Sequence, residues 1–175
     1  MTISYRFCLK GYYGLMTDNL ESRVQVLEDT LAIQNLKHSY LNACDSKDVP
    51  VIISSFVSSS CLIDYGPVGI FTNPEDLAQV FKEVACHDFM LESHHAHNPI
   101  IKILDSERAS GDWSLTYHLI NLSNETITTL QGSYRDLYQK AEGQWLIQET
   151  VFRAASSLNL EIEERMLKVI FAGKP

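Results

Sequence analysis

The sequence predicts an α+β fold in which helices come first and a strongly curved, mixed or antiparallel sheet comes after them. Two observations carry this prediction. In the first half of the chain, apolar residues recur three or four positions apart, as on the buried face of a helix. From residue 92 the pattern changes to long strand-like segments separated by short polar breaks, which is typical of antiparallel strands joined by tight turns. Helices succeeded by such strands indicate an α+β layer architecture.

Composition and charge fit one ordinary globular domain. The chain has 175 residues, 45% of them hydrophobic and 21% charged, and this length buries a core without disulfides or a metal. The formal net charge of −8 argues against nucleic acid and against an anionic membrane as partners, because phosphate groups attract a basic face. Four cysteines without Cys-x-x-Cys spacing indicate reduced thiols and a cytoplasmic location.

The N-terminal stretch differs in character from the rest of the chain. It lacks the continuous apolar core and the cleavage site of a signal peptide, and the segment from Met16 reads as a natural bacterial start. We therefore expect residues 1–15 to be an extension, packed on the surface as an extra strand, and residues 16–175 to form a single domain. No apolar run in the sequence is long enough to span a bilayer.

The helical half divides into four expected elements. A first helix is predicted over 18–28 and a second over 30–44, and a short helix or turn over 48–57. The apolar stripes are Leu20, Val24 and Leu27 in the first helix and Ile33, Leu36, Tyr40 and Cys44 in the second. A helix over 73–84 has the clearest start, because Asn73 is a good N-cap and Pro74 suits the first helical position.

The strand half begins early, with a hairpin predicted over 61–71 around Gly66-Pro67. Long strands are then expected at 92–105, 108–123, 126–141 and 144–155, and a closing helix is expected to begin near Asn159. A sheet of this kind can curl around a helix and leave one end open. The result is an apolar pocket between the concave face and the first helix.

Two side chains are candidates for chemistry in that pocket. Asp45 comes directly after the buried stripe of the second helix, so it either caps the helix at the surface or points into the pocket. His94 lies in the segment SHHAHN. In a strand, His94 shares one face with Asn98, and His95 shares the other with His97.

The residues alone leave three interpretations open. In the first, His95 and His97 form a His-x-His metal pair, although the expected third ligand is missing. In the second, His94 is a general base whose tautomer and charged form a buried carboxylate, Asp45, would stabilise. In the third, His94 is a satisfied core histidine and Asp45 an ordinary residue at a helix end.

Four segments taken together resemble the SnoaL-like, nuclear-transport-factor-2-like superfamily: AIQNLKHSYLNACDSKD, CLIDYG, HHAHN and YQKAEGQWLI. The resemblance covers about residues 20–155, and two branches look closest, scytalone dehydratase and the lindane dehydrochlorinase. It implies a cone-shaped α+β barrel with N-terminal helices packed on a curved sheet. It also implies a homo-oligomer, either a dimer or a trimer.

The resemblance assigns roles to particular residues. Asp45 and His94 match the aspartate and histidine of a catalytic dyad. Tyr65 matches a tyrosine that polarises the substrate carbonyl through a water in scytalone dehydratase, and Asn98 matches a pocket asparagine of the dehydrochlorinase. No metal and no organic cofactor are implied.

The sequence also departs from the scytalone dehydratase pattern. Cys44 stands where that enzyme has a second carbonyl-polarising tyrosine, with Tyr40 one turn earlier as a possible substitute. His118 is one residue out of register with a pocket histidine, and Gly132 and Tyr134 replace a serine and an asparagine. We therefore do not expect scytalone as the substrate. The expected substrate-binding residues are Tyr40, Cys44, Asn98, Trp113, His118 and Tyr134.

The leading functional hypothesis is a cofactor-independent, dehydratase-like lyase acting on a small apolar oxygenated molecule, such as a polyketide-like compound. His94 would remove a proton, Asp45 would hold the imidazole, and Tyr65 would stabilise oxyanion charge. One alternative is a SnoaL-like cyclase or an isomerase that uses the same cavity. Another is a non-catalytic module that binds small ligands, because fold alone does not fix function.

Overall fold

The computed structural model describes residues 19–163 and residue 169, and it has the α+β architecture that the sequence predicts. The expected extension at residues 1–15 lies outside the described residues. In chain order the elements are α1 (Leu20–Ser46), α2 (Val49–Ser54), β1 (Leu62–Asp64), a 3-10 turn (Gly66–Val68), β2 (Ile70–Phe71), α3 (Pro74–Val84), β3 (Met90–Ile103), β4 (Arg108–Asn121), β5 (Thr126–Ala141) and β6 (Gln144–Glu161). Within this part of the chain, no helix has the length and apolar character that a membrane crossing requires.

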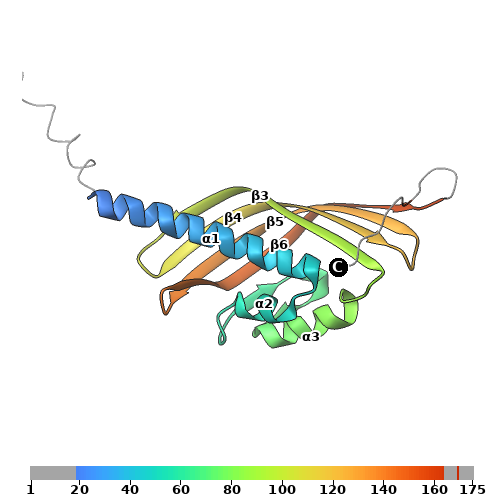
Figure 1. The fold of residues 1–175 in the computed structure, drawn as a ribbon, viewed down its shortest axis with the longest axis horizontal. Coiled ribbons are helices and arrows are strands. Elements are labelled where there is room, and N and C mark those ends of the chain that lie inside the picture. The colour runs from blue at the N-terminus through green and yellow to red at the C-terminus, as the bar shows by residue number, and fades with distance from the viewer. Residues whose placement is uncertain (1–18, 164–168, 170–175) are drawn as a thin grey trace, which may run out of the picture.

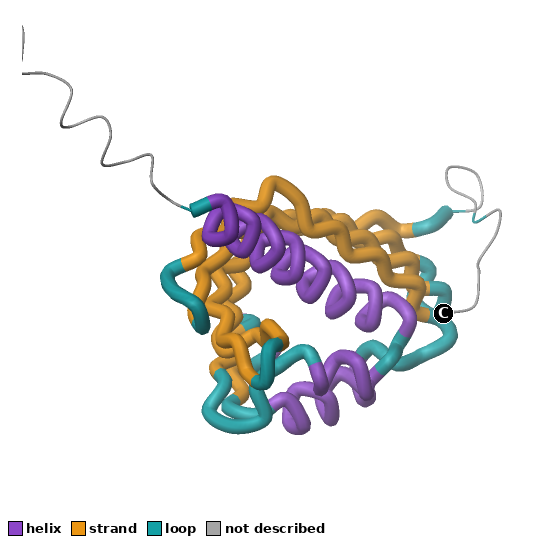
Figure 2. Tube along the Cα trace, turned by 60° about the vertical axis from the view of Figure 1, so that its left-hand side comes forward, coloured by secondary structure: helices purple, strands orange, loops and turns teal. Residues whose placement is uncertain are grey.

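The strands in the described residues form one mixed sheet in the order β2-β1-β6-β5-β4-β3. Strands β3 to β6 are antiparallel neighbours, whereas β1 pairs parallel with β6. Helix α1 runs diagonally across one face of the curved sheet (Figure 1). Helix α2 packs against α1, and α3 packs against α2. In Figure 2 these two short helices lie below the C-terminal half of α1. The sheet therefore wraps around the helix, as expected, and the concave face is the one that α1 covers.

Helix α1 is continuous, so the prediction of two separate helices over residues 18–44 is wrong. No proline or glycine interrupts the segment, and the helix runs from its N-cap Asn19 to Lys47, which ends it in the left-handed conformation. The first predicted stripe does not face the core, because Leu20, Val24 and Leu27 are exposed in the described structure. The buried face of the helix contains Asp29, Ile33, Lys37, Tyr40, Leu41, Ala43 and Cys44.

The short elements agree with their predictions. Helix α2 occupies the segment 48–57 that was expected to form a helix or turn. Helix α3 begins where the sequence indicates, since the Asn73 side chain accepts a hydrogen bond from the backbone N–H of Asp76 at 2.8 Å. Strands β1 and β2 form the antiparallel hairpin expected over 61–71.

Strand β6 extends further than its sequence pattern indicates, and the predicted closing helix does not begin near Asn159. Asn159 lies opposite Thr128 of β5 and accepts a hydrogen bond from its hydroxyl at 3.1 Å. Pairing with the long β5 continues to Glu161, and these strand hydrogen bonds override the helical pattern of the local sequence. Most of the rest of the predicted helix lies outside the described residues.

Gly132 makes room for an aromatic ring of the neighbouring strand. A Cβ atom at this position would lie 2.5 Å from ring carbons of Phe152 and 2.6 Å from the carbonyl oxygen of Arg153. The backbone oxygen cannot move without disturbing β6. We expect Gly132→Ala to lower the free energy of unfolding by about 1–3 kcal/mol, measured by urea denaturation. Ser133→Ala, at the neighbouring position, is the control; equal stability of both variants would contradict the expectation.

Candidate active site

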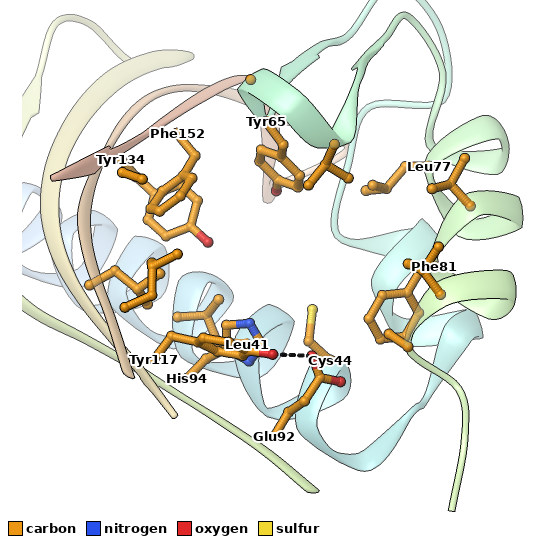
Figure 3. A pocket seen from close by; sticks show the side chains of 18 of the residues that line it. Leu41, Cys44, Tyr65, Leu77, Phe81, Glu92, His94, Tyr117, Tyr134 and Phe152 are labelled. Carbon is orange, nitrogen blue, oxygen red and sulfur yellow. Dashed lines mark hydrogen bonds between the residues drawn. The ribbon is translucent and has the colours of Figure 1, made fainter. Parts of the chain in front are cut away.

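A cavity of about 470 Å³ lies between α1, α3 and the concave face of the sheet. Figure 3 shows the side chains that surround it. The walls are largely apolar and include Leu41, Ile52, Leu77, Val80, Phe81, Leu115, Leu130 and Phe152. A few polar side chains interrupt them, among them Tyr40, Cys44, Tyr65, Glu92, His94, Tyr117 and Tyr134. A mostly apolar cavity of this size with few polar groups is typical of a small-molecule site.

Asp45 and His94 lie in hydrogen-bond contact at this cavity. Nδ1 of His94 lies 2.6 Å from Oδ1 of Asp45, and the backbone N–H of His94 donates to both carboxylate oxygens at 3.1 Å. The side chains of His94 and Asp45 are 16% and 25% exposed, respectively. Because an ionised carboxylate only accepts hydrogen bonds, this contact places a proton on Nδ1, and in the neutral imidazole Nε2 is then an acceptor. The imidazole lies at the cavity wall (Figure 3).

Local structure explains this placement. Asp45 occupies the last turn of α1, directly after the buried Cys44, and the left-handed residue Lys47 then ends the helix. In β3, alternation of side chains turns Glu92 and His94 toward the same face. One carboxylate thus fixes both the ring of His94 and the backbone of its strand.

Tyr40 and Tyr65 meet in the same cavity. Their hydroxyl oxygens are 2.6 Å apart and hydrogen-bonded, although the chain positions are far separated. Burial raises the pKa of both hydroxyls, so both are neutral hydrogen-bonding groups. Cys44 lines the adjoining wall, and burial raises the pKa of its thiol to about 12. Such a thiol stays protonated near neutral pH and is a poor nucleophile.

Glu92 is a further polar residue of the cavity, and it was not predicted from the sequence. Glu92 lines the cavity, accepts a hydrogen bond from the Tyr117 hydroxyl at 2.8 Å and forms an ion pair with the ammonium of Lys47. Tyr117 lies directly opposite His94 in the β3–β4 pairing, and the two ring centroids are 4.6 Å apart. Burial raises the pKa of Tyr117. Glu92 was detectable in principle, because it precedes His94 by two residues on one strand face.

Three of the expected substrate-binding residues do not line the cavity. Asn98 has a φ of 53° beside a β-bulge, which breaks the alternation of β3 and leaves the side chain on the exposed side. His118 is exposed, with Nδ1 3.2 Å from the Thr129 hydroxyl. Trp113 is in the core, where its indole N–H donates to the Tyr138 hydroxyl at 2.9 Å.

The two histidines of the His-x-His interpretation make separate local contacts. Nε2 of His95 lies 2.8 Å from the Ser93 hydroxyl, and Nε2 of His97 lies 3.0 Å from the Thr116 hydroxyl. Both contacts lie at the surface. Among the described residues, no three His, Cys, Asp or Glu side chains come together as a metal-binding group.

The fold and this pocket define a SnoaL-like α+β protein with a histidine–carboxylate pair beside an apolar cavity. The chain belongs to the SnoaL-like domain family, whose model matches residues 25–151. The superfamily predicted from the sequence is therefore confirmed, and so is the fold class.

Solved structures share the fold at low sequence identity. A candidate scytalone dehydratase from Novosphingobium aromaticivorans is 19% identical, with a TM-score of 0.72 over 81% of this chain and 93% of that one. A hexachlorocyclohexane dehydrochlorinase from Novosphingobium barchaimii is 16% identical, with a TM-score of 0.72 over 79% of this chain and 94% of that one. A type 2 hexachlorocyclohexane dehydrochlorinase is 14% identical, with a TM-score of 0.74 over 83% of this chain and 100% of that one.

Proposed function

We propose that this protein is a cofactor-independent lyase of the dehydratase kind, which takes a proton from carbon in a small, apolar, oxygenated substrate. The observation that carries the proposal is the contact of 2.6 Å between His94 Nδ1 and Asp45 Oδ1 at the wall of an apolar cavity. A carboxylate in that position sets the imidazole tautomer and stabilises the imidazolium that proton abstraction creates.

In the proposed reaction the substrate is a β-hydroxy ketone. Nε2 of His94 removes a proton from the carbon next to the carbonyl, and the electron pair of the broken C–H bond forms an enolate. The tyrosine hydroxyls in the cavity, Tyr65 among them, stabilise the negative oxygen. The enolate then expels the hydroxyl group, which takes the proton from His94 and leaves as water. The base is thereby regenerated.

The structural neighbours support a reaction of this class. Two of these neighbours are named as a candidate scytalone dehydratase and a hexachlorocyclohexane dehydrochlorinase. A dehydratase removes water from its substrate, and a dehydrochlorinase removes hydrogen chloride. Both reactions combine loss of a proton with loss of a group from the neighbouring carbon. The cavity of this chain offers a base for the first event and hydrogen-bonding groups for the second.

The test is deuterium exchange monitored by NMR, with cyclic β-hydroxy ketones in D2O, beginning with 3-hydroxycyclohexanone. We expect protein-dependent deuterium incorporation next to the carbonyl, together with formation of the enone. Asp45→Asn should slow the exchange about a hundredfold, because the amide does not stabilise the imidazolium. Exchange that is unaffected by this substitution would contradict the proposal. Exchange that yields a rearranged product without loss of water would point to an isomerase instead.

A further inference from the structure

A lysine is fully buried in the apolar face of α1, next to the candidate site. The Lys37 side chain has no solvent exposure, and its Nζ lies 2.8 Å from Oδ2 of the equally buried Asp136. This contact has the distance of an ion pair without the geometry of a hydrogen bond, and Nζ has no hydrogen-bond partner among the described residues. Burial lowers the pKa of Lys37, while the charge of Asp136 opposes this shift. A fully buried ammonium beside a single carboxylate oxygen needs an explanation.

The ammonium faces an aromatic ring that belongs to the cavity wall. Nζ of Lys37 lies 3.6 Å from the centroid of the Tyr134 ring, within the range of a strong cation–π contact. The Tyr40 ring is more distant, with its centroid 5.7 Å away. Of these two cavity-lining tyrosines, Tyr134 is therefore the one in direct contact with the Lys37 ammonium.

The hydroxyl of Tyr134 differs from the other tyrosine hydroxyls that line the cavity. Those of Tyr40 and Tyr65 share one hydrogen bond, in which one hydroxyl donates to the other, and that of Tyr117 donates to Glu92. Within the part of the chain that the structure describes, the Tyr134 hydroxyl makes no hydrogen bond to a protein acceptor. Figure 3 shows it directed into the cavity. Its proton is consequently available to a bound molecule.

We propose that the Tyr134 hydroxyl donates a hydrogen bond to the oxyanion of an enolate or phenolate bound in this cavity, and that Lys37 strengthens this donor through its contact with the tyrosine ring. The inference rests on the proposed function, because it names the group that faces the substrate oxygen. The ligand class is a planar apolar molecule whose oxygen carries negative charge. Tyr134 touches the ligand, whereas Lys37 is a positioning residue that acts through it.

The physical basis is polarisation of the phenol. When an anionic oxygen accepts the Tyr134 hydrogen bond, electron density shifts onto the phenol and its ring. A cation against the ring face stabilises that density. Burial raises the pKa of Tyr134 itself, so the hydroxyl keeps its proton and remains a donor. The effect requires a neutral phenol and a charged lysine, and the ion pair with Asp136 favours the charged lysine.

The test uses 4-nitrophenolate as the oxyanion probe, with 4-nitroanisole as the neutral analogue of nearly the same shape. Dissociation constants are measured at a pH where the phenol is ionised. The comparison is between the wild type and the double variant Lys37→Met/Asp136→Asn, each with Tyr134 intact and with Tyr134→Phe. The double variant removes the buried lysine charge together with its carboxylate partner, so neither variant leaves an uncompensated buried charge. Binding of 4-nitroanisole reports whether the pocket is intact.

We expect wild-type protein to bind 4-nitrophenolate, and Tyr134→Phe to weaken this binding about tenfold through loss of one charge-assisted hydrogen bond. Removal of the Lys37 charge should weaken binding about fivefold when Tyr134 is present. It should weaken binding less than about twofold when Tyr134 is replaced by phenylalanine. Binding of 4-nitroanisole should stay the same throughout.

Equal losses from Lys37 replacement with and without the Tyr134 hydroxyl would overturn the role of Lys37, because a merely structural lysine would act in both backgrounds. Unchanged binding to Tyr134→Phe, or no binding of 4-nitrophenolate to wild-type protein, would overturn the role of Tyr134. These outcomes are independent of the dyad. If 4-nitrophenolate binds as expected while Asp45→Asn leaves the rate of deuterium exchange unchanged, the oxyanion site is supported and the proposed lyase function is refuted.

Discussion

Substitution of His94 by glutamine is expected to slow protein-dependent deuterium exchange into a cyclic β-hydroxy ketone about a thousandfold. Glutamine has similar size and polarity but no group that accepts a proton near neutral pH. The loss should appear in the rate of the chemical step, with little change in the substrate concentration that gives half the maximal rate, because the apolar walls are untouched.

The structure indicates that His94→Gln should leave the local fold intact. Asp45 is also bound by the backbone N–H of residue 94, which glutamine retains, so the end of α1 should stay attached to β3. His118→Gln is the matched control, since this histidine makes its contact at the surface and does not line the cavity. Wild-type exchange in the His118→Gln protein is expected. A His94→Gln protein that exchanges as fast as wild type would refute His94 as the base.

Lys37→Met should be the most destabilising of these substitutions, with a loss of about 3–5 kcal/mol in the free energy of unfolding. The change leaves the fully buried Asp136 carboxylate without its cation. Two hydrogen bonds would remain, from the Tyr138 and Thr150 hydroxyls, each at 2.7 Å. Hydrogen bonds from neutral hydroxyls do not replace a full positive charge in a low-dielectric interior.

Urea unfolding monitored by circular dichroism measures this loss, and Lys37→Met/Asp136→Asn is its control. The double variant removes both charges while keeping side-chain size nearly constant. We therefore expect most of the stability to return, because replacing a buried ion pair by neutral groups is often close to neutral. A double variant as unstable as Lys37→Met would mean that side-chain packing, rather than an uncompensated charge, explains the loss.

Much of the fold was predictable from local patterns. The start of α3 could be inferred from Asn73 and Pro74, and the four long strands from alternation and polar breaks. The errors occurred where tertiary contacts decide. The exposed stripe through Leu20 and Leu27 has ideal helical spacing but lies outside the described core. The end of β6 pairs with β5 despite a locally helical pattern.

The candidate site was predictable in part. The sequence resemblance indicated Asp45, His94 and Tyr65. In the structure His94 and Tyr65 line one cavity, and Asp45 is hydrogen-bonded to His94. Asn98 was misplaced because a β-bulge cannot be seen from alternation. Lys37 was missed although its spacing from Ile33 fits the buried stripe, since a lysine in a helix normally faces solvent. Its partner, Asp136, lies on a strand far along the chain.

The cavity draws its parts from different regions of the chain, and this has a consequence for how such proteins diversify. The imidazole and its carboxylate come from β3 and the end of α1, whereas Leu77, Val80 and Phe81 come from α3. Replacements on α3 can reshape the apolar wall while the His94–Asp45 pair keeps its geometry. A lineage with this architecture can thus keep one histidine–carboxylate pair while it changes which small molecules fit beside it.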